Sequence, residues 1–174
     1  MKINQYVTLL TLLLQNSVIA NFEYWSEFIL RIQRDEGARH PALTKMFGGL
    51  RIPSLFCLRL RSPWRFGKQL EWDEAIQQFP VKGVPPVAVE APMQASLLMT
   101  KLNKMISTVR VSEDSELTLD LSDGSSMVVQ GIGGGWDESW ILELPADDPD
   151  RDQWQIICES QGLIGGRFPT PIHI

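Results

Sequence analysis

The spacing of apolar residues changes near residue 110, and this change constrains the fold more than any other feature of the chain. Before it, apolar side chains recur at helical spacing, as at Leu98, Leu102 and Ile106. After it, apolar and polar residues alternate, as in residues 117–121, which is typical of a half-buried strand. The sequence therefore predicts an α+β fold in which N-terminal helices pack on a C-terminal antiparallel β-meander.

Helical spacing predicts three helices in the first part of the chain. The second of them has a good N-cap in Asn21, and its Glu27 and Arg31 have the spacing of a favourable i,i+4 pair. The predicted helices cover residues 4–15, 21–35 and 92–108.

The segments between these helices are less regular. Residues 56–61 alternate in a way that predicts a strand with one basic face. Trp72 and Ile76 mark a short helix that Pro80 ends, and the proline-rich residues 81–92 predict an extended connection.

The last third of the chain is typical of antiparallel strands. Asp123 and Gly124 form a strong hairpin-turn signal between two alternating segments. No internal repeat is evident, and the chain is interpreted as a single domain over residues 1–174, mostly helical in 1–110 and strand-rich in 111–174. The predicted meander has four strands, over about residues 117–121, 127–132, 139–144 and 154–158.

The first twenty residues permit two interpretations. An apolar run over residues 7–14 follows Lys2, and residues 18–20 are compatible with a signal-peptidase site, which would make the protein a periplasmic binding or inhibitor protein. However, the run is amphipathic and contains two threonines, which favours a core helix and a cytoplasmic protein. The run is also too short and too polar to span a membrane.

The two cysteines, Cys57 and Cys158, lie in apolar runs. Buried free thiols are common in such surroundings, and two cysteines do not make a disulfide framework. Both are therefore expected to be reduced.

The net charge of −5 conceals a strong asymmetry. Residues 1–110 carry 14 basic and 8 acidic side chains, whereas residues 111–174 carry 2 basic and 13 acidic ones. Two explanations remain open: the acidic part attracts a basic partner and repels nucleic acid, or the two parts neutralise each other within the fold.

An acidic loop has the spacing of a calcium-binding loop. Asp148, Asp150, Asp152 and Glu159 occupy ligand positions of an EF-hand, but Gln153 stands where the sharp turn requires glycine. The residues that follow also resemble a strand instead of a helix, so no metal site is predicted.

Two further motifs suggest phosphate or nucleic-acid binding only weakly. The glycine-rich residues 131–135 lead into a predicted strand, whereas phosphate-binding loops lead into a helix. A basic cluster with aromatic residues between its members is short, and we expect it to pair with the acidic part of the chain. This cluster consists of Arg59, Arg61, Arg65 and Lys68, with Trp64 and Phe66.

Catalytic signatures are scarce. The histidines, His40 and His173, lie in a turn and next to the C-terminus, and neither belongs to a nucleophile elbow or a metalloprotease motif. The prediction is a protein without catalytic residues or cofactors, and a small enzyme with a dispersed active site is the alternative.

The strand region resembles a known group of bacterial proteins. Residues 117–124, residues 127–129 and the Asp137–Leu142 segment combine a strand, an Asp-Gly turn, a second strand and a Glu-Ser-Trp strand. Within about residues 95–165, this arrangement resembles immunity proteins of polymorphic toxin and contact-dependent inhibition systems. The resemblance implies a non-catalytic protein that binds and blocks a cognate toxin, often a basic nuclease.

These observations predict a cytoplasmic immunity protein that covers the active site of its toxin, without binding nucleic acid or a membrane. Carboxylates would steer a basic partner, and a partly exposed tryptophan would supply affinity. The predicted partner-binding residues are Trp136, Asp137, Glu138, Asp147, Asp148, Asp150 and Asp152.

Overall fold

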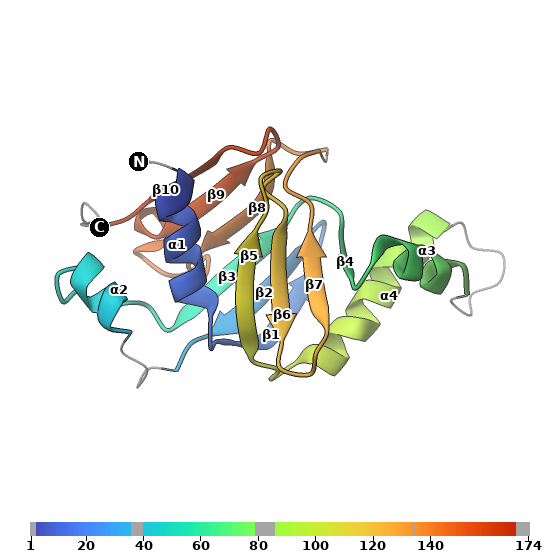
Figure 1. Ribbon diagram of the computed structural model, residues 1–174, viewed down its shortest axis with the longest axis horizontal. Coiled ribbons are helices and arrows are strands. Elements are labelled where there is room, and N and C mark those ends of the chain that lie inside the picture. Colours follow the sequence, from blue (N-terminus) through green and yellow to red (C-terminus); the bar gives the residue numbers. More distant parts are fainter. Residues whose placement is uncertain (1–2, 36–39, 79–85, 134, 170–174) are drawn as a thin grey trace.

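The computed structural model describes residues 3–35, 40–78, 86–133 and 135–169 (Figure 1). Its helices and strands form two layers of antiparallel sheet with helices at their edges and ends. The helices are α1 (Ile3–Leu14), α2 (Pro41–Met46), α3 (Gln69–Gln78), α4 (Pro86–Lys101) and the short 3₁₀ turn η1 (Arg151–Gln153). The strands are β1 (Val18–Tyr24), β2 (Phe28–Gln33), β3 (Leu55–Leu60), β4 (Trp64–Phe66), β5 (Ile106–Val111), β6 (Leu117–Leu121), β7 (Ser126–Val129), β8 (Glu138–Glu143), β9 (Gln155–Glu159) and β10 (Ile164–Arg167).

The strands form two separate sheets. The larger has the order β1-β2-β3-β8-β9-β10, and the smaller has the order β4-β7-β6-β5; every pairing is antiparallel. The predicted α+β class is therefore confirmed. The prediction of one continuous meander is wrong in one respect, because the chain changes sheet between β7 and β8.

The two sheets arise from an internal structural repeat that was not evident in the sequence. In the first half, α1 precedes the meander β1-β2-β3, and β4 then crosses to pair with β7 of the other sheet. In the second half, α4 precedes the meander β5-β6-β7, and β8 crosses to pair with β3. Each half thus gives its fourth strand to the sheet of the other half.

Backbone details support this repeat. Asn16 follows α1 with a φ of 64°, and Asn103 follows α4 with a φ of 62°. The amide of Asn16 donates to the carbonyl of Ile106, and the amide of Asn103 donates to the carbonyl of Ile19, both at 2.8 Å. The first strand of each meander also has a bulge after the equivalent isoleucine, Ile19 or Ile106. The two halves therefore meet about an approximate two-fold axis near the bridge between Val18 and Met105.

A continuous apolar core joins both sheets and α1. Helix α1 contributes Leu9, Leu10, Leu13 and Leu14, which are at most 1% exposed, and it packs near β5 and β10 (Figure 1). The predicted core helix over residues 4–15 is therefore confirmed. None of the helices within the described residues is both long and apolar enough to cross a membrane.

The predicted helix over residues 21–35 is wrong, because this segment forms the hairpin β1–β2. Phe28, Leu30 and Ile32 alternate with partly exposed residues in β2 and face the core. Trp25, between the two strands, is 79% exposed. Asn21 does not cap a helix; its side chain accepts a hydrogen bond from the amide of Phe22 next to the bulge in β1.

The region around α4 also differs from its prediction. The extended connection predicted for residues 81–92 is wrong from Pro86 onward, where α4 begins, and residues 81–85 lie outside the described residues. The helix predicted to reach residue 108 ends at Lys101, because Asn103 adopts a left-handed conformation and residues 106–111 pair with β6. The predicted strand at residues 56–61 and the short helix around Trp72 are confirmed as β3 and α3.

Candidate protein-binding surface

The outer face of the six-stranded sheet carries a row of charged side chains. Strand alternation turns Leu58, Leu60 and Leu142 toward the core, and it turns the residues between them away from it. The register places Arg31 beside Cys57, and Cys57 beside Glu143. This face was predicted from the sequence to be basic, but the neighbouring strand β8 supplies carboxylates to it.

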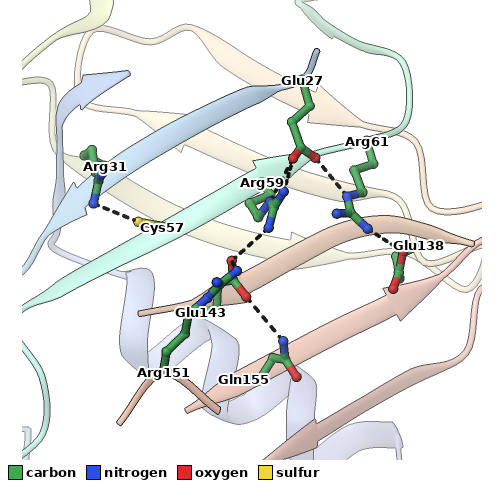
Figure 2. Close-up of polar contacts among 9 residues, drawn as sticks. All are labelled: Glu27, Arg31, Cys57, Arg59, Arg61, Glu138, Glu143, Arg151 and Gln155. Atoms are coloured by element: carbon green, nitrogen blue, oxygen red, sulfur yellow. Dashed lines mark hydrogen bonds and ion pairs between the residues drawn. The ribbon is translucent and has the colours of Figure 1, made fainter. Parts of the chain in front are cut away.

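Ion pairs on this face form a connected network (Figure 2). Glu27 accepts hydrogen bonds from both Arg59 and Arg61, the latter at 2.8 Å. Arg61 also donates to Glu138 at 2.5 Å, and Arg59 lies 3.3 Å from Glu143. The charges therefore alternate across the sheet, so that Arg59 and Arg61 each contact two carboxylates.

Glu143 forms the other end of this network. Its carboxylate, 5% exposed, accepts hydrogen bonds from Arg151 at 2.5 Å and from Gln155 at 3.3 Å (Figure 2). The side chain of Glu27 is similarly buried, at 8% exposed. Burial raises the pKa of Glu27, but the hydrogen bonds and charges of Arg59 and Arg61 outweigh burial and hold its pKa below the ordinary value. Both carboxylates therefore lie buried beneath guanidinium groups.

The charge asymmetry of the sequence is partly neutralised within the fold. Among the described residues, cations of the first 110 residues pair with carboxylates of the last 64 in five places, and this bears out the expectation that Arg59, Arg61 and Arg65 of the basic cluster pair with the acidic part. The pairs are Arg59 with Glu143, Arg61 with Glu138, Arg65 with Glu116, Lys101 with Asp123, and Arg110 with Asp120. The basic cluster itself is divided, because Arg59 and Arg61 lie beside the six-stranded sheet and Arg65 lies in β4 of the other.

The predicted partner-binding residues fall into two groups at opposite ends of β8. Trp136, Asp137 and Glu138 precede or begin the strand, whereas the four aspartates follow it in the β8–β9 loop. The strand has six residues, so the groups are separated by roughly 16 Å at about 3.3 Å per residue. The four aspartates are Asp147, Asp148, Asp150 and Asp152.

Hydrogen bonds order the acidic β8–β9 loop. Asp148 accepts from the amide of Asp150, and Asp150 accepts from the side chain of Gln153. Trp154 is buried, and the strand β9 begins immediately after it, as predicted. Within the described residues, no group of three or more histidine, cysteine or acidic side chains is arranged to hold a metal ion.

The glycine-rich segment crosses from one sheet to the other. A Cβ on Gly131 would lie 2.1 Å from the backbone of Ser115, so only glycine fits at this crossing. Gly133 has a φ of 88°, and its carbonyl accepts a hydrogen bond from Ser62 at 2.7 Å. The segment thus connects strands, as predicted, and it places Trp136 beside Arg61.

Trp136 lies on the surface in a defined position. Its side chain is 49% exposed, and the guanidinium carbon of Arg61 lies 5.4 Å from its ring centroid. Because Arg61 is itself held by Glu27 and Glu138, the ring has a fixed charged neighbour on one side.

Two exposed aromatic residues that the sequence analysis did not select lie at the same end of the sheet. Tyr24, the last residue of β1, and Trp25, the first residue of the β1–β2 turn, are 52% and 79% exposed. Tyr24 and Gly135 line one pocket of about 340 Å³, whose walls also include Glu27, Arg61 and Glu90. Trp25 and Trp136 each follow a residue of this lining. The alternation of apolar and polar residues in residues 28–33 could have predicted β2. A turn before that strand would then have been expected, and its aromatic side chains would have been expected to be exposed.

The two cysteines lie on opposite faces of the six-stranded sheet. Cys57 lies on the charged face within 3.3 Å of Arg31, and Cys158 faces the core. Neither forms a disulfide, in agreement with the prediction. Burial raises the pKa of both thiols, to about 12 for Cys158, so neither is activated as a nucleophile at neutral pH.

Comparisons of this chain with known protein families, curated proteins and solved structures find no match.

Proposed function

We propose that this chain is a cytoplasmic immunity protein that binds a basic toxin domain and blocks its active site. The observation that carries the proposal is a set of three exposed aromatic side chains at one end of the sheet: Tyr24, which lines the pocket near Glu27, and Trp25 and Trp136, which each follow a lining residue. Large aromatic residues supply most of the affinity in many protein interfaces, particularly when they fill a partner's pocket.

The distribution of charge supports a basic partner. The ion-pair network leaves the centre of the charged sheet face close to neutral, because four glutamates there pair with four arginines. Further carboxylates lie at both ends of β8, with Asp137 and Glu159 near Trp136 and the four aspartates in the β8–β9 loop. Acidic groups around aromatic residues increase the association rate with a basic protein.

The test begins with the gene immediately upstream, which we expect to encode a large secreted protein with a variable C-terminal toxin domain. Coexpression of this chain with that domain should restore growth, and the two purified proteins should form a complex. Continued toxicity together with the absence of a complex would refute the proposal.

Trp136→Ala should weaken that complex at least about tenfold, because truncation of an interface tryptophan commonly costs about 2 kcal/mol. Leu70→Ala is the matched control, since Leu70 is an apolar side chain that is 71% exposed on α3. Equal affinity of both variants would show that Trp136 lies outside the interface.

The acidic loop can be tested separately. Changing Asp147, Asp148, Asp150 and Asp152 together to asparagine should slow association with the toxin at low salt, and the difference should shrink at high salt because exposed charges are screened. Unchanged association kinetics at low salt would restrict the interface to the Trp136 end of β8.

A further inference from the structure

The pocket at the aromatic end of the sheet has a composition that identifies the chemistry of its occupant. It lies between the β1–β2 turn, the β3–β4 connection, α4 and the segment before Trp136. Its charged lining residues are two carboxylates, Glu27 and Glu90, and one guanidinium, Arg61. The lining therefore carries one net negative charge within walls that include Tyr24 and Trp64.

The two carboxylates of the pocket differ in their existing partners. Glu27 is occupied by Arg59 and Arg61. Glu90, on the α4 side, accepts a hydrogen bond from the indole of Trp72 at a long 3.4 Å. A carboxylate that accepts one long hydrogen bond retains acceptor positions for a charged donor.

The chain itself shows how a guanidinium is held at this position. Arg61 lies over the ring of Trp136 while two carboxylates, Glu27 and Glu138, accept its hydrogen bonds. A similar combination of an aromatic face and a carboxylate is available on the solvent side, where Tyr24 and Glu90 line the same pocket and the exposed Trp25 follows Tyr24 in the chain. Guanidinium groups favour such sites because they stack on aromatic rings and donate to carboxylates at the same time.

We infer that this pocket receives an arginine side chain of the partner protein, with Glu90 as its acceptor and with Tyr24, Trp25 and Trp136 around its plane. The inference rests on the proposed function in that a protein partner supplies the arginine. It identifies the contact that anchors this partner, whereas the aspartates of the β8–β9 loop act at a distance through charge.

The pocket can be tested without the toxin. The probe is N-acetyl-arginine amide, added at millimolar concentration to the ¹⁵N-labelled full chain, and the readout is the indole N–H signals of its tryptophans. The signals of Trp25 and Trp136 should shift in a saturable manner, whereas the neutral analogue N-acetyl-citrulline amide should leave them unchanged. Equal shifts with both compounds, or none with either, would refute the arginine pocket.

Two variants make the test specific. Glu90→Gln should weaken the binding of the arginine probe about fivefold, in line with the loss of one charged contact of about 1 kcal/mol. Glu113→Gln, an exposed carboxylate between β5 and β6 that does not line the pocket, is the matched control and should leave binding unchanged. Equal loss in both variants would indicate general electrostatic attraction and would contradict a defined site at Glu90.

The outcome is distinguishable from that of the proposed function. Protection against the toxin without saturable arginine binding would retain the immunity role and remove the pocket from it. Arginine binding without any protection would retain the pocket and refute the toxin partner.

Discussion

The two halves of the molecule have the same order of elements but different outer surfaces. Both begin with a helix, continue into a three-stranded meander and give a fourth strand to the opposite sheet. The first meander belongs to a six-stranded sheet whose outer face carries a buried ion-pair network. The second meander belongs to a four-stranded sheet. The two halves therefore share the order of elements and the backbone turns. Among the described residues, the ion-pair network and the pocket with its aromatic residues are not repeated.

This contrast indicates which residues fix the fold and which remain free to serve function. The equivalent asparagines after α1 and α4 and the equivalent bulges in β1 and β5 lie near the approximate two-fold axis. The pocket and its exposed aromatic rings lie where the β1–β2 turn meets the segment before β8, and β8 is the strand that the second half gives to the first.

The crossing strands offer the test with the largest expected effect. Trp140 begins the part of β8 that pairs with β3 and is 0% exposed, and Trp64 begins β4 and is 4% exposed. Either change to alanine should lower the free energy of unfolding by about 3–5 kcal/mol through cavity formation. Trp140→Ala should be the more severe, because the indole of Trp140 also donates to the carbonyl of Ser115.

Urea denaturation of both variants measures this difference. Trp25→Ala is the control, since Trp25 is 79% exposed and its loss should change stability by at most about 0.5 kcal/mol. If Trp140→Ala or Trp64→Ala lowered the free energy of unfolding as little as Trp25→Ala does, the tryptophan of that crossing strand would not be needed to hold the two sheets together.

The outer faces of the two sheets should differ next. Glu143→Ala leaves Arg151 without its carboxylate and Arg59 with Glu27 alone, and we expect a loss of about 3 kcal/mol. Asp120→Ala removes the partner of Arg110, whose side chain is 60% exposed, and should cost at most about 1 kcal/mol. Comparable losses from thermal or chemical unfolding would contradict the distinction drawn between a buried network and an exposed ion pair.

The repeat itself predicts two equal and moderate effects. Asn16→Ala and Asn103→Ala each force a Cβ-bearing residue without a favourable side chain into a left-handed conformation, at a cost of about 1 kcal/mol. Asn→Gly at either position should be nearly neutral, because glycine adopts positive φ readily. Markedly unequal losses in the two halves, measured by denaturant midpoints, would show that the two turns are not equivalent.

The smallest effect concerns pH and belongs to the first half alone. Because its folded-state pKa is lowered, ionised Glu27 contributes stability above its ordinary pKa of about 4.5, and this contribution is lost as the pH falls through the folded pKa. The destabilisation caused by Glu27→Gln should therefore be greatest near neutral pH and should shrink in acid. A destabilisation independent of pH between neutral and acidic conditions would mean that the charge of Glu27 does not stabilise the fold.

Local patterns in the sequence were sufficient where neighbouring residues decide the structure. The amphipathic spacing of residues 4–15 and the alternation in residues 117–121 and 154–158 identified α1, β6 and β9. In residues 21–35 the apolar residues fit both the spacing of a helix and the alternation of a strand, and the prediction of a helix there was wrong. The strand was stabilised there by pairing with β3, a partner more than twenty residues away.

The sequence also indicated the components of the candidate surface without their grouping. Trp136 was selected because it lies in a predicted loop, and the surplus of carboxylates was evident from the composition. Tyr24, Trp25 and Glu90 were not selected. These residues come together only because the β1–β2 turn, α4 and the segment before β8 meet in space. No spacing within a single segment contains that information.

By itself, the sequence determined the α+β class, the core helix α1, the free cysteines and the imbalance of charge, because each depends on local periodicity or on composition. The tertiary structure alone decided that the strands divide into two sheets with an exchanged fourth strand. It also decided that arginines of the first half neutralise glutamates of the second, and that Tyr24 lines an acidic pocket next to which Trp25 and Trp136 each follow a lining residue. Those features depend on contacts between residues far apart in the chain, and such contacts form only when the whole core is buried.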